Sequence, residues 1–216
     1  MAYGLLGRKI NNLSAWIAVL ILVLAAVPAA AGGPVRIVML GDSITAGYGL
    51  PPQDALPFRL QEKLKADGLS VTIHNAGVSG DTTAGGQARL DWALGDRADG
   101  LIVALGGNDG LRGLDPAATR DHLAAILAAA KARGLKVLLA GMLAPPNLGA
   151  DYQRAFNAIF PALAARFQVP FYPFLLAGVA ARPALNQADG IHPNARGVGV
   201  IVERLAPYVK RLVAGD

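Results

Sequence analysis

Short apolar runs alternate with amphipathic stretches along most of the 216-residue chain. Five runs are rich in Val, Ile, Leu or aromatic residues, as strands are: residues 35–40, 71–75, 100–105, 136–143 and 169–172. Most of these runs are continuous rather than alternating, which is typical of strands buried on both faces of a parallel sheet. Helical periodicity predicts helices between and after them, over residues 55–67, 83–95, 116–133, 151–167 and 195–213. The alternation predicts an α/β fold, a three-layer α/β/α sandwich around a mostly parallel five-stranded sheet.

The N-terminal 31 residues do not follow this alternation. Arg8 and Lys9 precede an apolar core, IAVLILVLAAV at 17–27, and small residues follow it up to Ala31. This order is typical of a secretory signal peptide, and eleven apolar residues are short of the roughly 20 that a membrane-spanning helix needs. We therefore expect cleavage after Ala31, a single domain over residues 32–216, a periplasmic or secreted location and no stable membrane insertion after cleavage. An uncleaved N-terminal anchor is the alternative.

The composition and charge of the chain argue against some classes of binding partner and covalent attachment. The formal net charge of the whole chain is +5, and it falls to +3 without Arg8 and Lys9. Aromatic residues make up only 6% of the chain and no basic stripe is present, which argues against a nucleic-acid partner. The chain contains no cysteine, so neither a disulfide framework nor a lipoprotein attachment is possible. The sequence does not indicate an oligomeric state.

Polar, glycine-rich loops follow the first three predicted strands, and a fourth precedes the last predicted helix. Their sequences are GDSITAG (41–47), AGVSGDT (76–82), GGNDG (106–110) and DGIHPN (189–194). Loops at the carboxyl ends of parallel strands meet at one edge of the sheet, where ligands of such folds bind. We therefore expect the functional residues of the protein to lie at that edge.

Ser43 in the first loop has three interpretations. It caps a helix, it binds phosphate, or it is a nucleophile; the phosphate interpretation lacks the lysine that a P-loop needs. A nucleophilic serine needs a base and a group that orients the base. Of the three histidines, His74 lies in a strand pattern and is expected to be structural, and His122 lies on a predicted helix as a surface or boundary residue. His192 follows Asp189 by three residues in a loop, and a turn of that length can bring the carboxylate to the imidazole. His192 is therefore the best candidate for the base, and Asp189 for the group that orients it.

Four sequence blocks occur in a characteristic order: GDSIT, NAGVSGDTT, GGND and DGIHPN. Together they resemble the blocks of the SGNH hydrolases, also called the GDSL esterase/lipase family, and the resemblance covers nearly all of residues 35–210. Ile44 stands where that family usually has leucine, which is a conservative departure. Longer stretches such as SGDTTAGGQARL are similar to a bacterial periplasmic branch that includes thioesterases, lysophospholipases and arylesterases. The resemblance implies a flavodoxin-like SGNH fold that hydrolyses acyl esters or thioesters.

The resemblance also implies a role for individual residues. Ser43 is the expected nucleophile, His192 its base and Asp189 the residue that orients the base. The expected oxyanion hole consists of the backbone N–H groups of Ser43 and Gly80 and the side-chain amide of Asn108. We expect Asp42 and Asp109 to shape their loops rather than to catalyse.

Apolar residues in loops at the same edge suggest a site for an acyl chain. The residues expected to bind substrate are Leu111, Leu143, Pro145 and Leu148, with Met142 on the same exposed loop. The expected partner is a small-molecule acyl ester or thioester. We expect no metal or other cofactor, because the histidines are isolated and no H-E-x-x-H motif occurs. A carbohydrate O-deacetylase and a non-catalytic lipid carrier are the alternatives.

Overall fold

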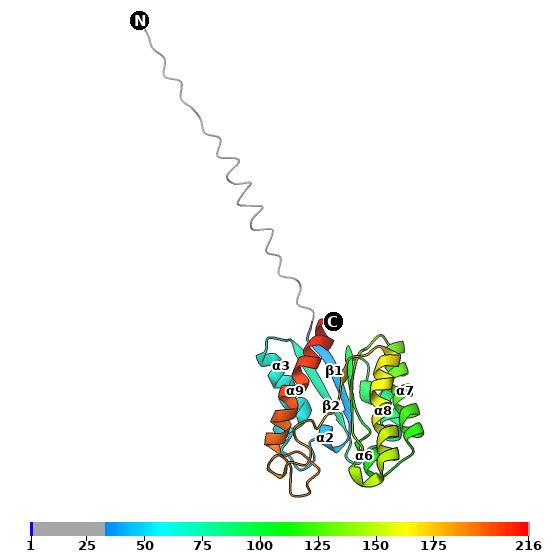
Figure 1. The fold of residues 1–216 in the computed structure, drawn as a ribbon. Helices are drawn as coiled ribbons and strands as arrows, with labels where there is room; N and C mark the ends of the chain where they lie inside the picture. Colours follow the sequence, from blue (N-terminus) through cyan, green and yellow to red (C-terminus); the bar gives the residue numbers. More distant parts are fainter. Residues whose placement is uncertain (2–32, 216) are drawn as a thin grey trace. The chain divides into compact units, whose positions relative to one another are not determined.

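The computed structural model describes Met1 and residues 33–215, so the predicted signal peptide, apart from Met1, lies outside the described residues. Five parallel strands form one sheet in the order β2-β1-β3-β4-β5 (Figure 1). Their bounds are β1 Val35–Gly41, β2 Val71–Gly77, β3 Gly100–Ala104, β4 Lys136–Ala140 and β5 Phe171–Tyr172. The predicted α/β fold with a parallel five-stranded sheet is confirmed.

Helices cover both faces of the sheet, as expected (Figure 1). On one face lie α3 (Leu56–Ala66) and α9 (Ala195–Ala214), and on the other lie α4 (Thr83–Ala88), α5 (Leu90–Leu94), α7 (Pro116–Ala132) and α8 (Ala150–Phe167). The start of α7 shows why these residues form a helix. The Asp115 carboxylate caps it by accepting from the Ala117 N–H at 2.9 Å, and Pro116 occupies the first helical position.

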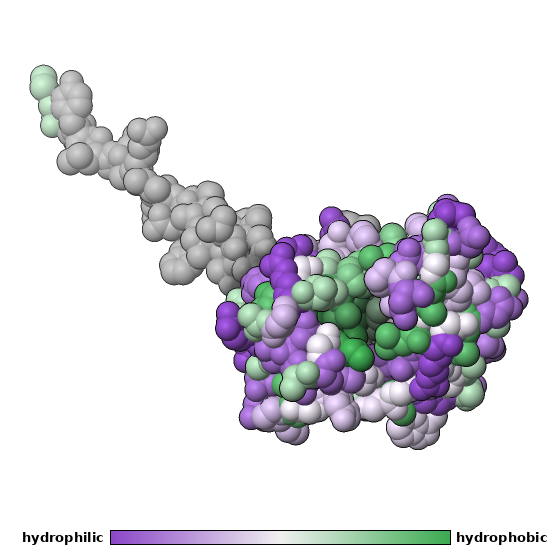
Figure 2. All heavy atoms as spheres, turned by 60° about the horizontal axis from the view of Figure 1, so that its bottom comes forward, coloured by the Kyte–Doolittle hydropathy of each residue, from purple (hydrophilic) through white to green (hydrophobic). Residues whose placement is uncertain are grey.

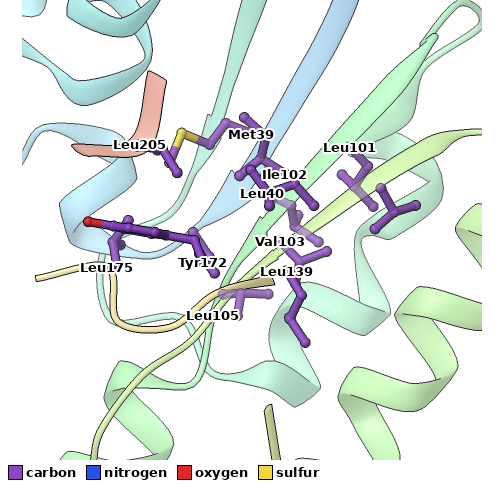
Figure 3. Packing of buried hydrophobic residues seen from close by; sticks show 14 of the residues in the cluster. Met39, Leu40, Leu101, Ile102, Val103, Leu105, Leu139, Tyr172, Leu175 and Leu205 are labelled. Atoms are coloured by element: carbon purple, nitrogen blue, oxygen red, sulfur yellow. The ribbon is translucent and has the colours of Figure 1, made fainter. Parts of the chain in front are cut away.

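The core lies between the central strands and the two helical layers. Large aliphatic side chains of β1, β3 and β4 lie at its centre, where they meet Leu175 and Leu205 from later in the chain (Figure 3). The inward faces of α3, α7, α8 and α9 supply most of the remaining large aliphatic side chains. β1, β3 and β4 are buried along almost their whole length, as their continuous apolar runs predict.

The edge strand β2 departs from the expectation of burial on both faces. Thr72 and His74 are exposed, while Val71 and Ala76 are buried. β2 has a neighbour on one side only, and no helix fully covers the face that Thr72 and His74 share. His74 is therefore an exposed residue of an edge strand.

Most predicted elements begin and end within two residues of their predicted bounds, and two differ by more. The predicted helix 83–95 is divided at Arg89, whose backbone (φ −106°, ψ 10°) ends α4 and precedes α5. The fourth strand ends at Ala140 rather than at residue 143. Two short helices follow strands directly, α2 (Ser43–Ala46) and α6 (Gly107–Leu111), and three 3₁₀ turns lie at Pro52–Asp54, Pro146–Leu148 and Pro183–Leu185. Within the part of the chain that is described, we find no helix long and apolar enough to cross a bilayer.

Candidate active site

The four polar loops meet at the carboxyl edge of the sheet, the end of the molecule that carries α2 and α6 in Figure 1. Ser43 is the first residue of α2, directly after β1. Gly80 follows β2, and Asn108 lies in α6 after β3. Asp189 and His192 lie in the loop before α9. The loop positions agree with those expected from the sequence.

Ser43, His192 and Asp189 are hydrogen-bonded in series. His192 Nε2 lies 2.9 Å from Ser43 Oγ, and His192 Nδ1 lies 2.7 Å from Asp189 Oδ2. A carboxylate only accepts hydrogen bonds, so Nδ1 carries the proton and donates it to Asp189. In the neutral ring Nε2 is then the acceptor for the Ser43 hydroxyl. This tautomer can accept the proton that a serine must lose to attack a carbonyl carbon.

Hydrogen bonds within the loop fix the positions of Asp189 and His192. Asp189 Oδ1 accepts from the backbone N–H groups of Ile191 at 2.9 Å and His192 at 3.0 Å. These bonds and the contact with the His192 ring lower the pKa of Asp189 from 3.8 to about 2, with the His192 backbone N–H as the largest cause. Asp189 is therefore ionised at neutral pH, and the 38% exposure of its side chain to water also favours the charged form. Asn194 then caps α9 by accepting from the Arg196 and Gly197 N–H groups, each at 3.0 Å.

Three hydrogen-bond donors lie beside the serine loop. The backbone N–H groups of Ser43 and Gly80 donate to no other described residue. Gly80 has φ +81°, a conformation that favours glycine, and its carbonyl accepts from Arg112 Nη2 at 2.8 Å. Asn108 Nδ2 donates to the Asp81 carbonyl at 2.9 Å, which fixes the amide and leaves its second N–H available. Backbone and amide N–H groups without a protein acceptor are the kind of donor that stabilises an oxyanion in acyl transfer.

Asp42 is buried directly before the serine. It is 2% exposed, and its Oδ1 caps α2 by accepting from the Ile44 N–H at 3.0 Å. Burial raises the pKa of Asp42 from 3.8 to about 6, against the opposing effects of that hydrogen bond and of His192. Asp42 thus shapes the serine loop, the role that the sequence predicts for it.

Asp109, the neighbour of Asn108, lies in a buried polar cluster. Its carboxylate accepts from the Thr83 hydroxyl at 2.6 Å and from the Thr83 backbone N–H at 2.9 Å. Thr119 Oγ1 lies 3.4 Å away, and the half-buried His122 places Nδ1 3.3 Å from Thr83 Oγ1. The Thr83 hydroxyl donates its one proton to Asp109, so His122 donates through Nδ1. The cluster ties α6 to α4 and α7, and His122 is a boundary residue of α7, as predicted.

The predicted acyl-binding residues divide into two groups. Leu111 and Leu143 are 51% and 48% exposed, whereas Pro145 and Leu148 are half-buried. The prediction for Met142 is wrong, because Met142 is only 3% exposed. Its side chain turns inward and lies beneath Gly106 of the GGND loop. Figure 2 shows the same end of the molecule, where apolar surface lines a hollow between polar flanks.

The cavity at Ser43 itself is small. Its lining includes Tyr48, Leu50 and His192, and its volume is about 10 Å³. The Tyr48 ring lies 4.6 Å from that of His192, centroid to centroid, and is 53% exposed. The structure therefore has little enclosed space directly at Ser43.

Sequence reasoning missed two residues that hold the loops together, Asp81 and Arg89. Arg89 Nε donates to Asp81 Oδ2 at 2.7 Å, and both side chains are mostly buried. Both residues lie in the stretch SGDTTAGGQARL that carries the family resemblance, but the resemblance assigns no role to either of them. Their position within a helix pattern also gives no sign that Arg89 turns toward the strand ends.

A doubly wound parallel sheet with a Ser–His–Asp series at its carboxyl edge defines an α/β protein of the hydrolase class. The model of the GDSL-like Lipase/Acylhydrolase family matches residues 39–200, and the chain belongs to this family. The protein is a carboxylic ester hydrolase.

Similar proteins are known from several bacteria. The chain is 41% identical over 178 residues to Esterase TesA of Pseudomonas aeruginosa, covering 82% of this chain and 89% of the relative. It is 39% identical over 208 residues to Thioesterase 1/protease 1/lysophospholipase L1 of Escherichia coli, covering 95% and 98%. The crystal structure of AlinE4, an SGNH-hydrolase family esterase, superposes with a TM-score of 0.71 at 46% identity, covering 83% of this chain and 97% of that one.

Proposed function

We propose that this protein is an exported serine hydrolase that cleaves carboxylic ester and thioester bonds of acyl substrates. The observation that carries the proposal is the hydrogen-bonded series from Ser43 Oγ through His192 to the ionised Asp189. Relatives described as an esterase and as a thioesterase and lysophospholipase support the substrate class.

The proposed first half-reaction acylates the enzyme. Ser43 Oγ forms a bond to the acyl carbon while its proton passes to His192 Nε2, and the carbonyl electrons move onto oxygen. The N–H groups of Ser43, Gly80 and Asn108 stabilise the oxyanion, and Asp189 stabilises the imidazolium. The tetrahedral intermediate collapses, the bond to the alcohol or thiol breaks, and the leaving group takes the proton from His192.

The second half-reaction returns the enzyme to its starting state. Water gives a proton to His192 Nε2 and attacks the acyl carbon, and collapse releases the carboxylic acid. The proton on His192 then returns to Ser43 Oγ. All proton transfers use His192, which lies within hydrogen-bond distance of Ser43.

Replacement of the serine tests this proposal. Ser43→Ala should lower the kcat for p-nitrophenyl butyrate by several orders of magnitude, because acylation loses its nucleophile. A fluorophosphonate probe should label the wild type once, at Ser43, and should not label the variant. Circular dichroism should show that the fold is retained. Unchanged hydrolysis in a folded Ser43→Ala variant would contradict the proposal.

A panel of substrates tests the proposed class. Aryl esters, acyl-CoA thioesters and lysophospholipids should all be hydrolysed in a Ser43-dependent manner. A preference for acetylated sugars over these acyl substrates would favour the O-deacetylase alternative instead.

A further inference from the structure

We propose that Arg89 is a positioning residue that sets the relative positions of all three oxyanion-hole donors. This inference rests on the proposed function, because it assigns a role in stabilising the oxyanion of that reaction. The argument begins from the hydrogen bonds of the Arg89 guanidinium, which the proposed mechanism does not use.

The Arg89 guanidinium contacts three segments at the carboxyl edge. Nη1 donates to the Ala76 carbonyl and Nη2 to the Gly41 carbonyl, each at 2.9 Å, while Nε donates to Asp81 Oδ2 at 2.7 Å. Gly41 and Ala76 lie at the ends of the neighbouring strands β1 and β2. The side chain is 17% exposed and that of Asp81 is 11% exposed. The interaction is therefore largely shielded from solvent, unlike a surface ion pair.

Two of these contacts, those with Gly41 and Asp81, lead to the three oxyanion-hole donors. Gly41 lies two residues before Ser43, and its carbonyl also accepts from the Val78 N–H at 3.1 Å. Asp81 follows Gly80 directly. The Asp81 carbonyl accepts from Asn108 Nδ2 at 2.9 Å, so the same residue holds the third donor. One planar guanidinium thus connects the loops that carry all three N–H groups.

The division of the predicted helix 83–95 belongs to the same arrangement. α4 ends at Ala88, and Arg89 is the single residue that separates α4 from α5. From this position its side chain reaches the ends of β1 and β2. Gly85 leaves room for the partner, because a Cβ atom there would lie 1.8 Å from Asp81 Oδ1.

The test uses Arg89→Lys, because lysine keeps the positive charge but cannot form the planar fork. A shift of about 1 Å in a catalytic group can cost roughly 10²-fold in rate. We therefore expect kcat to fall about 10- to 100-fold, with KM changed less than about 3-fold. Prolonged fluorophosphonate labelling counts the active serines, and kcat is expressed per labelled site. A merely structural role would lower the number of labelled sites and leave kcat per site unchanged.

Two further measurements sharpen the test. The affinity for an alkyl boronic acid, which forms a tetrahedral anion on the serine, should fall in parallel with kcat/KM. The shape of the pH–rate profile should not change, because Arg89 does not contact His192 or Asp189. Arg133→Lys is the matched control, since Arg133 pairs with Asp91 on the surface with 42% and 82% exposure, and it should leave kcat unchanged.

A kcat per site within 2-fold of the wild type in Arg89→Lys would overturn the inference, as would a loss confined to KM. If Arg89→Lys does not fold, Asp81→Asn replaces it, and we expect a loss of kcat in the same direction. A folded Asp81→Asn variant with the kcat of the wild type would also overturn the inference. Absence of Ser43-dependent hydrolysis in the wild type would instead contradict the proposed function itself.

Discussion

The carboxyl group of Asp42 is shielded from solvent beside the proposed nucleophile, and burial raises its pKa to about 6. In the unfolded chain the pKa of an aspartate is near 3.9. Between these values the folded protein binds more protons than the unfolded chain, so the free energy of unfolding falls as the pH rises through this window. The serine loop therefore contains a carboxylate that costs stability at neutral pH.

Asp42→Asn should remove this cost and keep the cap on α2, because asparagine also accepts from the Ile44 N–H. We expect the variant to be more stable than the wild type by about 1–3 kcal/mol at pH 8, and to be less dependent on pH between 4 and 7. Urea denaturation at a series of pH values measures both the stability difference at pH 8 and the pH dependence of the free energy of unfolding. Asp96→Asn, at an exposed position, controls for the loss of one charge. An undiminished pH dependence in Asp42→Asn would contradict the raised pKa.

At the scale of elements, the connection between β4 and α8 carries an exposed leucine, Leu143, after the carboxyl end of β4. The Asn157 side chain in α8 accepts from the Ala144 N–H at 2.9 Å and so fixes the connection. Leu143 beside it stays exposed while Met142 is buried. An exposed leucine on a fixed backbone is a suitable wall for an acyl chain that lies along an open hollow.

Leu143→Ala should therefore lower kcat/KM for octanoyl and longer esters and leave acetyl esters unaffected. Burying one methylene group of the substrate completely contributes about 0.8 kcal/mol to binding. Because the acyl chain would lie on an open surface, we expect each methylene to contribute less than this. We also expect activity to change gradually with acyl-chain length, without a sharp cut-off. A series of p-nitrophenyl esters from acetyl to dodecanoyl measures this dependence. We expect Leu148→Ala, at the half-buried leucine of the same connection, to have the same chain-length-selective effect. Equal losses at all chain lengths in Leu143→Ala would mean that the loop is only structural.

The cluster around Asp109 joins α4, α6 and α7 through hydrogen bonds that are closed to solvent. Thr83→Val should destabilise the protein by about 1–3 kcal/mol, because the shape is kept while the buried carboxylate loses one donor. Urea denaturation measures the change. Thr72→Val on the exposed face of β2 is the control, and it should change stability much less. Equal effects of the two variants would contradict a stabilising role for the cluster.

At the scale of the whole molecule, much of the architecture follows from local pattern. Continuous apolar runs predict the buried strands β1, β3 and β4, and four loop motifs indicate the sheet edge at which Ser43 and His192 meet. The position of Arg89 was not predictable in the same way, because local periodicity does not encode the contact of its side chain with the Gly41 carbonyl, 48 positions away. The burial of Met142 and the exposure of His74 depend on strand order and loop packing, which local periodicity does not encode.

Export is the prediction that concerns the chain as a whole. We expect protein recovered from a periplasmic fraction to begin at or near Gly32, because the basic, apolar and small-residue regions end there. N-terminal sequencing or intact-mass measurement shows this directly. Full-length protein that remains in the membrane fraction would favour the uncleaved anchor.

The hydrogen bond between Ser43 and His192 joins residues 149 positions apart in the sequence. During synthesis the serine loop leaves the ribosome early, whereas the Asp189–His192 loop and α9 come almost last. A nascent chain therefore presents the proposed nucleophile before its proposed base has been made. The proposed Ser43–His192–Asp189 series forms only when the C-terminal segment docks against the serine loop, so we expect hydrolytic activity to appear with the last step of folding.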